Sequence, residues 1–218
     1  MYRATAYTFL IFTLVVQGAN LNAALAADDP MQPIFEGKTL DGWVIEGNKA
    51  EGIWNVTDEG ELHCQGKGFG FLRYDTELCD FEVELEYKMG KDCNSGLGIR
   101  GAPYTSHNKR PSVSGYELQI LADSGKKPSG GGSMSLYHLI APQVNATKAV
   151  GEWNTVNIVC RGPQITVTQN GQVVHDFDQS ENPRTKDKPL CGYFSVQNHN
   201  REIWYRNIRL RKLDADKR

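Results

Sequence analysis

The feature that most constrains this chain is a strict alternation of apolar and polar residues over short runs. In the segment FEVELEYKM, residues 81–89, the odd positions are apolar and the even positions are charged. A period of two places the two sets on opposite faces of a β-strand, whereas a helix needs a period near 3.6. Helical periodicity is almost absent elsewhere, so we expect a chain built from strands.

Other short strand-like runs are separated by Gly, Pro, Asn and Asp. They lie at residues 53–56, 61–64, 69–74, 96–100, 116–121, 153–160, 164–177, 191–198 and 203–211. Asn170-Gly171 is the strongest short signal for a hairpin turn, and alternation breaks near Asn207, where a β-bulge is expected. Roughly ten to thirteen strands without a long linker predict an all-β fold, a two-sheet antiparallel sandwich of jelly-roll type.

The first 26 residues have the pattern of a signal peptide. Arg3 precedes the apolar run FLIFTLVV, which is short for a membrane span, and ALA follows at residues 24–26 as a cleavage signal. The alternative is an uncleaved membrane anchor. We therefore predict export to the periplasm or the medium. The predicted organisation is a signal peptide at 1–26, a short leader at 27–32, one β-sandwich domain at 33–213 and a tail at 214–218.

Charge and cysteine content exclude several classes of protein. A formal net charge of −2 argues against a nucleic-acid-binding protein and against electrostatic binding to a membrane. The 5 cysteines include no C-x-x-C pair, so zinc-ligand spacing is absent. Export permits disulfides, but an odd count leaves at least one thiol unpaired. Cys160 and Cys191 lie in strand-like runs and are expected to be small buried hydrophobes.

Three predicted strands carry polar side chains opposite an apolar face. In SGYELQILAD, residues 114–123, alternation turns Glu117 and Gln119 together away from the apolar side chains. Applied to NSGLGIRG and CGYFSVQNHN, the same rule predicts one polar face that collects Arg100, Glu117, Gln119, Gln197 and His199. Two glycines beside the arginine would leave room for a ligand to approach the sheet, and the alternative is a β-bulge with a surface arginine.

This mixture of donors, acceptors and one carboxylate suits a polyhydroxylated ligand better than a lipid or a metal. A second carboxylate, as a common glycosidase needs, is not evident on these strands. Asp123 could serve only if the following loop, DSGKKPSGGGSMS, folds back as a rim or lid. The plain alternative is a polar sheet face that meets water.

Six sequence blocks follow one another over about residues 33–213: IFEGKTLDGWVIEG, CDFEVELEYKMGKDCNSGLGIRG, GYELQILAD, SLYHLIAP, GEWNTVNIVCRGPQITVTQNGQVVHDFD and GYFSVQNHNREIWYRNIRL. In these blocks the chain resembles the 3-keto-disaccharide hydrolase family, also described as a 3-keto-glucoside 1,2-lyase/3-keto-2-hydroxyglucal hydratase domain. The resemblance implies a concanavalin A-like jelly roll of the lectin and glucanase type. Its motif residues fall on Asn94, Arg100, Glu117, Gln119, Tyr137, Gln197 and His199.

The chemistry that the resemblance implies needs one base rather than paired carboxylates. A ketone at C3 of a sugar acidifies the C2 proton, and its removal allows the C1–oxygen bond to break by β-elimination, with hydration of the resulting glucal completing net hydrolysis. Glu117 and His199 are assigned as base and acid, in an order left open. Arg100 with Gln119 would stabilise the C3 oxyanion. The residues expected to bind the substrate are Asn94, Gln119, Asp123, Tyr137 and Gln197.

No cofactor is firmly implied, although a divalent metal ion held by Glu117 and His199 could replace Arg100 as the electrophile. The expected partners are a glycoside or oligosaccharide substrate and an upstream sugar 3-dehydrogenase. The alternative function is a non-catalytic, lectin-like glycan-binding module, because this fold often binds glycans without chemistry. A buried Glu117 in a cleft shared with His199 would favour the enzyme. An open face with Glu117 ion-paired to Arg100 would favour the lectin.

Overall fold

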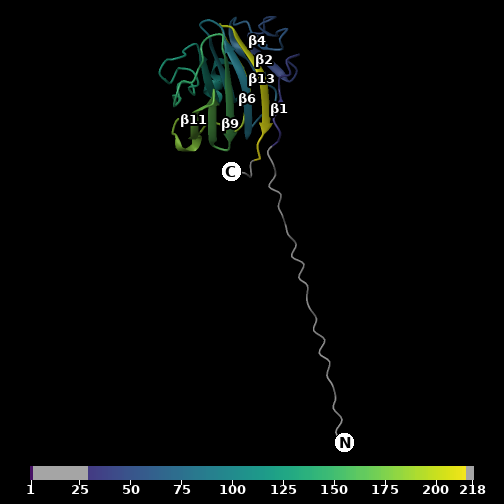
Figure 1. The fold of residues 1–218 in the computed structure, drawn as a ribbon, viewed down its shortest axis with the longest axis vertical. Helices are drawn as coiled ribbons and strands as arrows, with labels where there is room; N and C mark the ends of the chain where they lie inside the picture. The colour runs from purple at the N-terminus through teal and green to yellow at the C-terminus, as the bar shows by residue number, and fades with distance from the viewer. Residues whose placement is uncertain (2–28, 215–218) are drawn as a thin grey trace.

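The computed structural model describes Met1 and residues 29–214, in which two β-sheets pack face to face (Figure 1). The eight-stranded sheet contains β1 (Gln32–Pro33), β3 (Trp54–Val56), β4 (Leu62–Cys64), β6 (Phe81–Met89), β9 (Trp153–Arg161), β10 (Gln164–Gln169), β11 (Gln172–Asp178) and β13 (Ile203–Lys212). The five-stranded sheet contains β2 (Trp43–Gly47), β5 (Phe69–Tyr74), β7 (Asn94–Gly101), β8 (Tyr116–Leu121) and β12 (Tyr193–His199). Within the described residues the helices are short: η1 (His107–Lys109), α1 (Pro111–Ser114) and η2 (Gln179–Glu181).

The strand order positions the polar face. The larger sheet runs β11-β10-β9-β6-β13-β4-β3, with β1 added beside β13, and the smaller sheet runs β2-β5-β12-β7-β8. All defined strand pairs are antiparallel. The prediction of an all-β, two-sheet antiparallel sandwich of the concanavalin A-like jelly-roll type is confirmed. Because β12, β7 and β8 are neighbours, side chains from these three strands can meet on one face.

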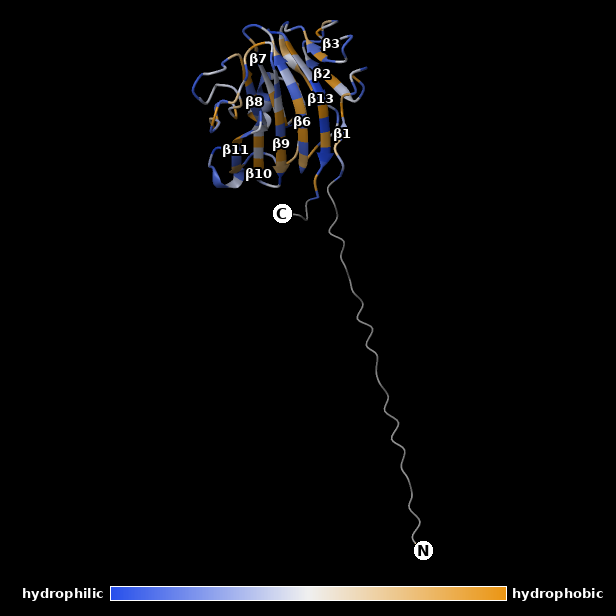
Figure 2. Ribbon diagram, in the orientation of Figure 1, coloured by the Kyte–Doolittle hydropathy of each residue, from blue (hydrophilic) through white to orange (hydrophobic). Residues whose placement is uncertain are grey.

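Alternation builds the core between the sheets. Along β6 the side chains of Phe81, Val83, Leu85, Tyr87 and Met89 are at most 2% exposed, whereas the charged residues between them face outward. Burying a side chain of this size stabilises the fold by roughly 1.5–3 kcal/mol. Figure 2 shows the resulting hydrophobic and hydrophilic bands along β6 and β9. The core therefore follows directly from the period-two pattern.

Two local predictions are confirmed. Asn170 and Gly171 have φ values of 49° and 79°, which suit a tight hairpin turn, and they join the antiparallel pair β10 and β11. The bulge expected near Asn207 interrupts the pairing of β13 with β6 between Arg206 and Arg209. Asn207 itself has a φ of 53°. The bulge lets Ile208 enter the core although it follows a break in alternation.

The cysteines divide into one disulfide and three buried thiols. Cys160 is fully buried and unpaired, as predicted, and so are Cys64 and Cys93. The prediction for Cys191 is wrong, because Cys191 forms a disulfide with Cys79. The strand begins only at Tyr193, so Cys191 precedes it and lies next to Gly192, which forms an isolated bridge with Leu78, the neighbour of Cys79.

The predicted signal peptide at residues 1–26 and the end of the tail lie outside the continuous described range, residues 29–214. Part of the predicted leader takes part in the larger sheet, because Gln32 pairs with Leu210 and the Asp29 amide donates to the Lys212 carbonyl. Between residues 29 and 214 the helices are too short and too polar to cross a bilayer.

Candidate active site

A small polar cavity opens on the outer face of the five-stranded sheet. Its volume is about 160 Å³. Six of the residues predicted for the site line it: Asn94, Glu117, Gln119, Tyr137, Gln197 and His199. Phe69, His107, Arg110 and Ser112 complete the lining, whereas Arg100 and Asp123 are not part of it. The strands thus bring together the polar side chains that alternation turned to one face.

Glu117 lies at the centre of this arrangement because β7 carries glycines between β8 and β12. Gly96 pairs with Gln119 on β8, and the carboxylate of Glu117 extends over Gly96. It reaches the far strand, where the Gln197 side-chain amide donates to its Oε1 at 2.7 Å. The prediction that the glycines clear space for a ligand is wrong: Gly96 makes room for Glu117, and Gly98 makes room for protein atoms above it.

The environment of Glu117 makes it a stronger base than an ordinary carboxylate. Its side chain is almost buried, and this desolvation raises its pKa. Hydrogen bonds from Ser112 and Gln197 and the positive charge of Arg110 act in the opposite direction but do not cancel the effect. Arg110 also donates from Nε to the Ser112 hydroxyl at 3.0 Å. The carboxylate is therefore hydrogen-bonded by the neutral side chains of Ser112 and Gln197, and Arg110, which donates to Ser112, acts on it through its charge.

His199 lines the same cavity from the end of β12. It is half-buried, and burial lowers the pKa of its imidazole. Its ring packs edge-on against Phe69, with the ring centroids 5.3 Å apart. His107, from η1, packs against the same phenyl ring at 6.0 Å. Phe69 thus orients two imidazoles at one side of the cavity.

Amide side chains and a tyrosine complete the polar lining. The Gln119 side-chain amide donates to Asn94 Oδ1 at 3.1 Å, which fixes both side chains on the cavity floor. Tyr137 comes from the long loop after β8, and its backbone amide donates to the Glu117 carbonyl at 2.8 Å. This hydrogen bond ties the backbone of Tyr137 to β8, and Tyr137 and Glu117 both line the cavity.

Asp123 does not lie in the cavity, contrary to its prediction as a substrate contact. Its carboxylate is buried and accepts the backbone amide of Ser133 at 3.0 Å and the side chain of Asn145 at 3.3 Å. The loop does fold back, but it does so along the edge of β8, where Gln119 donates to Ser135. Asp123 therefore holds the loop that carries Tyr137 rather than touching the space a ligand would fill.

Arg100 is also placed elsewhere, and its prediction as part of the polar face is wrong. A bulge between β7 and β12 leaves Arg100 with a φ of 54°, which reverses the direction of its side chain. The guanidinium is fully buried inside the sandwich. It donates to the carbonyls of Cys79 and Gly162 and to Gln179 Oε1. Arg100 thus ties the two sheets together beside the disulfide.

The sequence reasoning missed the four lining residues Phe69, His107, Arg110 and Ser112. Three of them belong to the segment that joins β7 to β8, where no periodicity gives a direction to side chains. The available signal was position, because a loop between two site strands can fold onto their shared face. Arg110 is the arginine that the cavity contains in place of Arg100.

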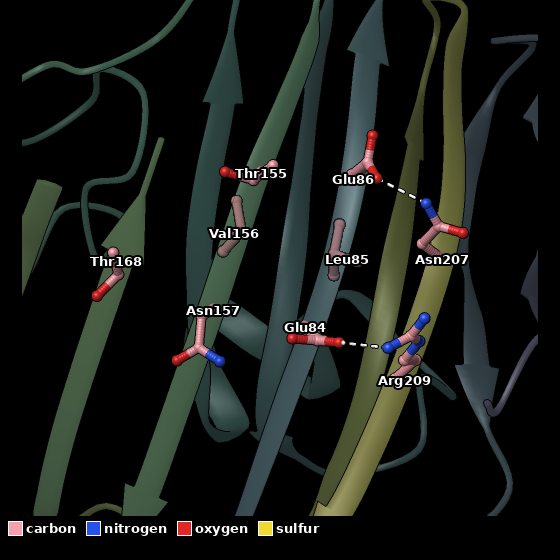
Figure 3. A pocket seen from close by; sticks show the side chains of 9 residues that line it. All are labelled: Glu84, Leu85, Glu86, Thr155, Val156, Asn157, Thr168, Asn207 and Arg209. Atoms are coloured by element: carbon pink, nitrogen blue, oxygen red, sulfur yellow. Dashed lines mark hydrogen bonds and ion pairs between the residues drawn. The ribbon is translucent and has the colours of Figure 1, made fainter. Parts of the chain in front are cut away.

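A second hollow, of about 250 Å³, lies on the outer face of the eight-stranded sheet (Figure 3). Side chains of the neighbouring strand β13 hydrogen-bond its carboxylates: Glu84 accepts from Arg209, and Glu86 accepts from Asn207 and Arg206. Such a ladder of exposed pairs is typical of a solvated sheet face. It offers no buried acid or base, so the cavity around Glu117 is the stronger candidate for chemistry.

The residues present give little support to a bound metal ion. Within residues 29–214 no group of three His, Cys, Asp or Glu side chains could hold one. Glu117 and His199 share the cavity, but one carboxylate oxygen already accepts from Gln197.

The fold and the cavity define a class: a concanavalin A-like jelly roll with one buried carboxylate and two imidazoles in a polar cavity on one sheet face. Residues 30–211 match the model of the 3-keto-alpha-glucoside-1,2-lyase-like domain family. The chain belongs to this family.

Individual relatives agree with this assignment. A Bacteroides thetaiotaomicron protein named 3-keto-disaccharide hydrolase is 27% identical over 225 residues, which cover 83% of this chain and 78% of the relative. The structure of a candidate glycosyl hydrolase from Parabacteroides distasonis superposes with a TM-score of 0.68 at 27% identity, covering 85% of this chain and 100% of that one. Another from the same organism gives a TM-score of 0.72 at 19% identity, covering 84% and 94%, which shows the fold alone.

The packing of Glu117 over Gly96 leads to a first prediction. A Cβ at residue 96 would lie 2.8 Å from Oε1 and 2.9 Å from Cγ of Glu117, so Gly96→Ala must displace the carboxylate. Displacing a reacting group by about 1 Å can lower kcat/KM roughly 100-fold. We expect a loss of this size on a 3-keto-glycoside, with a melting temperature near that of wild type.

Gly130→Ala is the matched control, because a Cβ at Gly130 meets no atom within 4 Å. Equal activity of Gly96→Ala and wild type would show that the position of Glu117 does not matter for turnover.

Proposed function

We propose that this chain is a carbohydrate-active enzyme that cleaves 3-keto-glycosides by removing the C2 proton and eliminating the group at C1. The observation that carries the proposal is the buried Glu117 carboxylate with its raised pKa, in one polar cavity with His199. Family membership and the name of the 27% identical relative support the substrate class. Perturbed titratable groups that share a cavity are a recurrent property of active sites.

The charge of the cavity favours elimination over direct glycoside hydrolysis. Ordinary glycosidases use two carboxylates about 5–10 Å apart on either side of the scissile bond. Glu117 is the one carboxylate among the lining residues of this cavity. A ketone at C3 removes the need for a second, because the electrons of the C2–hydrogen bond can delocalise onto the ketone oxygen.

Burial supports one of the two assignments of base and acid. A raised pKa makes the ionised Glu117 a stronger base, and a lowered pKa makes the protonated His199 a stronger acid. Glu117 therefore takes the C2 proton, and His199 gives a proton to the departing oxygen. The opposite assignment would use each group in its weaker role.

Arg110 and Gln119 are placed to stabilise the enolate oxygen at C3, since both line the cavity and both donate hydrogen bonds. Arg110 takes over the role that the sequence assigned to Arg100. Asn94, Tyr137 and Gln197 supply polar atoms that hold the sugar hydroxyls. The ring is thereby oriented with its C2 hydrogen towards Glu117.

The elimination takes two steps, and the addition of water follows. The C2–hydrogen electrons form the enolate as Glu117 gains the proton. The enolate then re-forms the ketone, a C1–C2 double bond appears, and the C1–oxygen bond breaks as the oxygen takes a proton from His199. Addition of water across this double bond, with hydroxyl at C1 and hydrogen at C2, gives the free 3-keto sugar and completes net hydrolysis. The ketone must come from a prior oxidation of the glycoside at C3, the reaction of a sugar 3-dehydrogenase.

A lectin-like module remains the alternative class, and Glu117 distinguishes the two. Binding without chemistry would suit an exposed carboxylate paired with an arginine on an open face. Glu117 is instead 5% exposed, and Arg100 lies inside the sandwich. The structure therefore has the features expected of the enzyme.

We also propose that the protein is exported. The Cys79–Cys191 disulfide suits an oxidising compartment, and the apolar run near the N-terminus suits a signal peptide.

The proposed reaction is tested by mass spectrometry in deuterated water with methyl 3-keto-α-glucoside as the substrate. We expect enzyme-dependent release of methanol and one deuterium at C2 of the hydrated product. Glu117→Gln should lower the rate roughly 100- to 10,000-fold, as expected for loss of a general base. Turnover without deuterium at C2, or full activity of the variant, would rule out proton abstraction by Glu117.

The melting temperature of Glu117→Gln is the control for folding. The pKa of Glu117 is higher in the folded protein than in the unfolded chain, so its ionisation weakens the fold as pH rises through the folded pKa. Glutamine does not ionise. The variant should therefore melt no lower than wild type, with an advantage that grows as pH increases.

The same two groups predict the pH dependence of kcat/KM. Activity should rise as Glu117 ionises and fall as His199 loses its proton. Burial raises the pKa of Glu117 and lowers that of His199, so the two limbs approach each other. We expect a narrow, mildly acidic optimum, with the alkaline limb lost in His199→Gln. An optimum in the alkaline range would contradict this assignment.

Export is tested by fractionating a Gram-negative host that expresses the full chain. The expected product is a periplasmic protein whose mass shows an N-terminus at Ala27 and whose Cys79 and Cys191 resist alkylation until reduced. Full-length protein confined to the cytoplasm would refute export.

A further inference from the structure

One side of the cavity around Glu117 is formed by a short helix rather than by the sheet. Ser112 belongs to α1 (Pro111–Ser114), Arg110 is the N-cap of this helix, and both residues line the cavity. Ser112 hydrogen-bonds the Glu117 carboxylate, and Arg110 acts on it through its charge. A helix of one turn is not stable in isolation, so these two contacts depend on the interactions that hold α1 against the sheet.

One side of α1 is held by packing against β7. A Cβ at Gly98 would lie 2.7 Å from Cγ of Pro111, and a Cβ at Gly101 would lie 3.2 Å from Cα of the same proline. The Ser114 hydroxyl accepts the amide of Ala102 at 3.0 Å. The two glycines therefore let α1 lie directly on the strand.

The C-terminal end of α1 is held by the ammonium group of Lys188. Its Nζ donates to the Gly115 carbonyl at 2.6 Å and to the Val113 carbonyl at 3.1 Å. The last carbonyls of a helix have no partner within the helix, and cationic side chains can satisfy them. Within residues 29–214 Lys188 takes part in no ion pair, and its ammonium lies 5.3 Å from the centre of the Tyr116 ring. Its charge is therefore directed at the end of α1 and not at a carboxylate.

The backbone of Lys188 is fixed in turn to the interior of the sandwich. The Lys188 carbonyl accepts from Gln179 Nε2 at 2.8 Å, and Gln179 Oε1 accepts from Arg100 at 3.0 Å. The Lys188 amide donates to the Thr185 carbonyl at 3.0 Å, and the Thr185 hydroxyl donates to the Gln179 carbonyl at 2.8 Å. Both Gln179 and Thr185 are buried. The ammonium therefore reaches α1 from a segment that is anchored in the interior.

We infer that Lys188 is a positioning residue for the candidate active site, because it holds α1 in the place where Ser112 meets Glu117. Arg110, the N-cap of α1, is held with it. Lys188 does not line the cavity, so its effect on the reaction passes through α1. The inference rests on the proposed function and adds to it a residue outside the cavity. Since Ser112 and Arg110 both lower the pKa of Glu117, loss of their contacts should raise it.

The first test follows the titration of the Glu117 carboxyl by NMR in protein isotope-labelled at glutamate. The Glu117 signal is the one that is missing from Glu117→Gln. Lys188→Met keeps the length of the side chain without its charge or its donors, and the titration of Glu117 should move to higher pH. Lys186→Met is the matched control, because Lys186 is exposed and does not line the cavity. The other titratable side chains that line the cavity are unchanged in both variants: His107, Arg110, Tyr137 and His199.

An unchanged titration of Glu117 in folded Lys188→Met would overturn the inference. Where this variant does not fold, Lys188→Gln takes its place. It keeps one donor and should give a smaller shift in the same direction, and no shift would again overturn the inference.

Ser112→Ala separates an action through α1 from a direct effect of the lysine charge. Alone, it should move the titration of Glu117 to higher pH, because the carboxylate loses one hydrogen bond. Added to Lys188→Met it should change little further, since residues that act as one unit do not give additive effects. Fully additive shifts would show that Lys188 acts through its charge alone and would overturn its positioning role.

The last measurement is the pH profile of turnover with methyl 3-keto-α-glucoside. In Lys188→Met kcat should fall roughly 10- to 100-fold, as for a misplaced reacting group, with a smaller change in KM. The acidic limb of the profile should move to higher pH together with the titration of Glu117. Full activity of Lys188→Met would overturn the inference. If wild type itself turns over no 3-keto-glycoside, the proposed function fails, and the NMR titrations still decide whether Lys188 positions α1.

Discussion

The burial of one carboxylate, that of Glu117, determines the chemistry that the candidate site can support. Glu117 lies almost out of reach of water because β7 has no side chain at Gly96, and neutral donors replace part of the lost hydration. Burying an ionised group weakens a fold unless the group is compensated, and here hydrogen bonds from Ser112 and Gln197 and the charge of Arg110 compensate it in part. The alternating core, with many fully buried apolar side chains, is large enough to support that cost. The same desolvation makes the carboxylate a better base.

The position of Arg100 explains why this arginine does not pair with Glu117. Arg100 belongs to the same strand as Gly96, and on an ideal strand both would face the cavity. The bulge reverses the direction of Arg100 and sends its guanidinium into the interior, towards Gln179 and the carbonyl of Cys79. A guanidinium placed directly against Glu117 would hold its pKa down and make it a weaker base. One irregular residue thus serves both the packing of the sheets and the basicity of the site.

Much of the fold follows from the sequence because a period of two has few structural solutions. The strands, the Asn170-Gly171 hairpin and the bulge near Asn207 depend on local rules, and all appear where expected. The polar face around Glu117 was also predictable, since it needs only alternation and neighbouring strands. The residues whose positions the sequence did not predict correctly depend on non-local geometry. The glycines near Arg100 allow a bulge, but they do not show that the arginine turns inward, and Asp123 could not be located without the path of its loop. Arg110 lies in a segment without any periodicity.

The charge of the cavity supports the proposed elimination over direct hydrolysis. A site for direct hydrolysis of a disaccharide needs carboxylates on both sides of the scissile bond. Glu117 is the one carboxylate among the residues that line this cavity, and its other polar side chains are imidazoles, amides, an arginine, a serine and a tyrosine. Direct attack on the anomeric carbon would therefore lack its second carboxylate. In the proposed reaction Glu117 acts instead on the hydrogen of the neighbouring carbon, C2, and His199 protonates the departing oxygen. On this proposal the carbon at which the base acts, rather than the fold, separates the reaction from that of a conventional glycosidase.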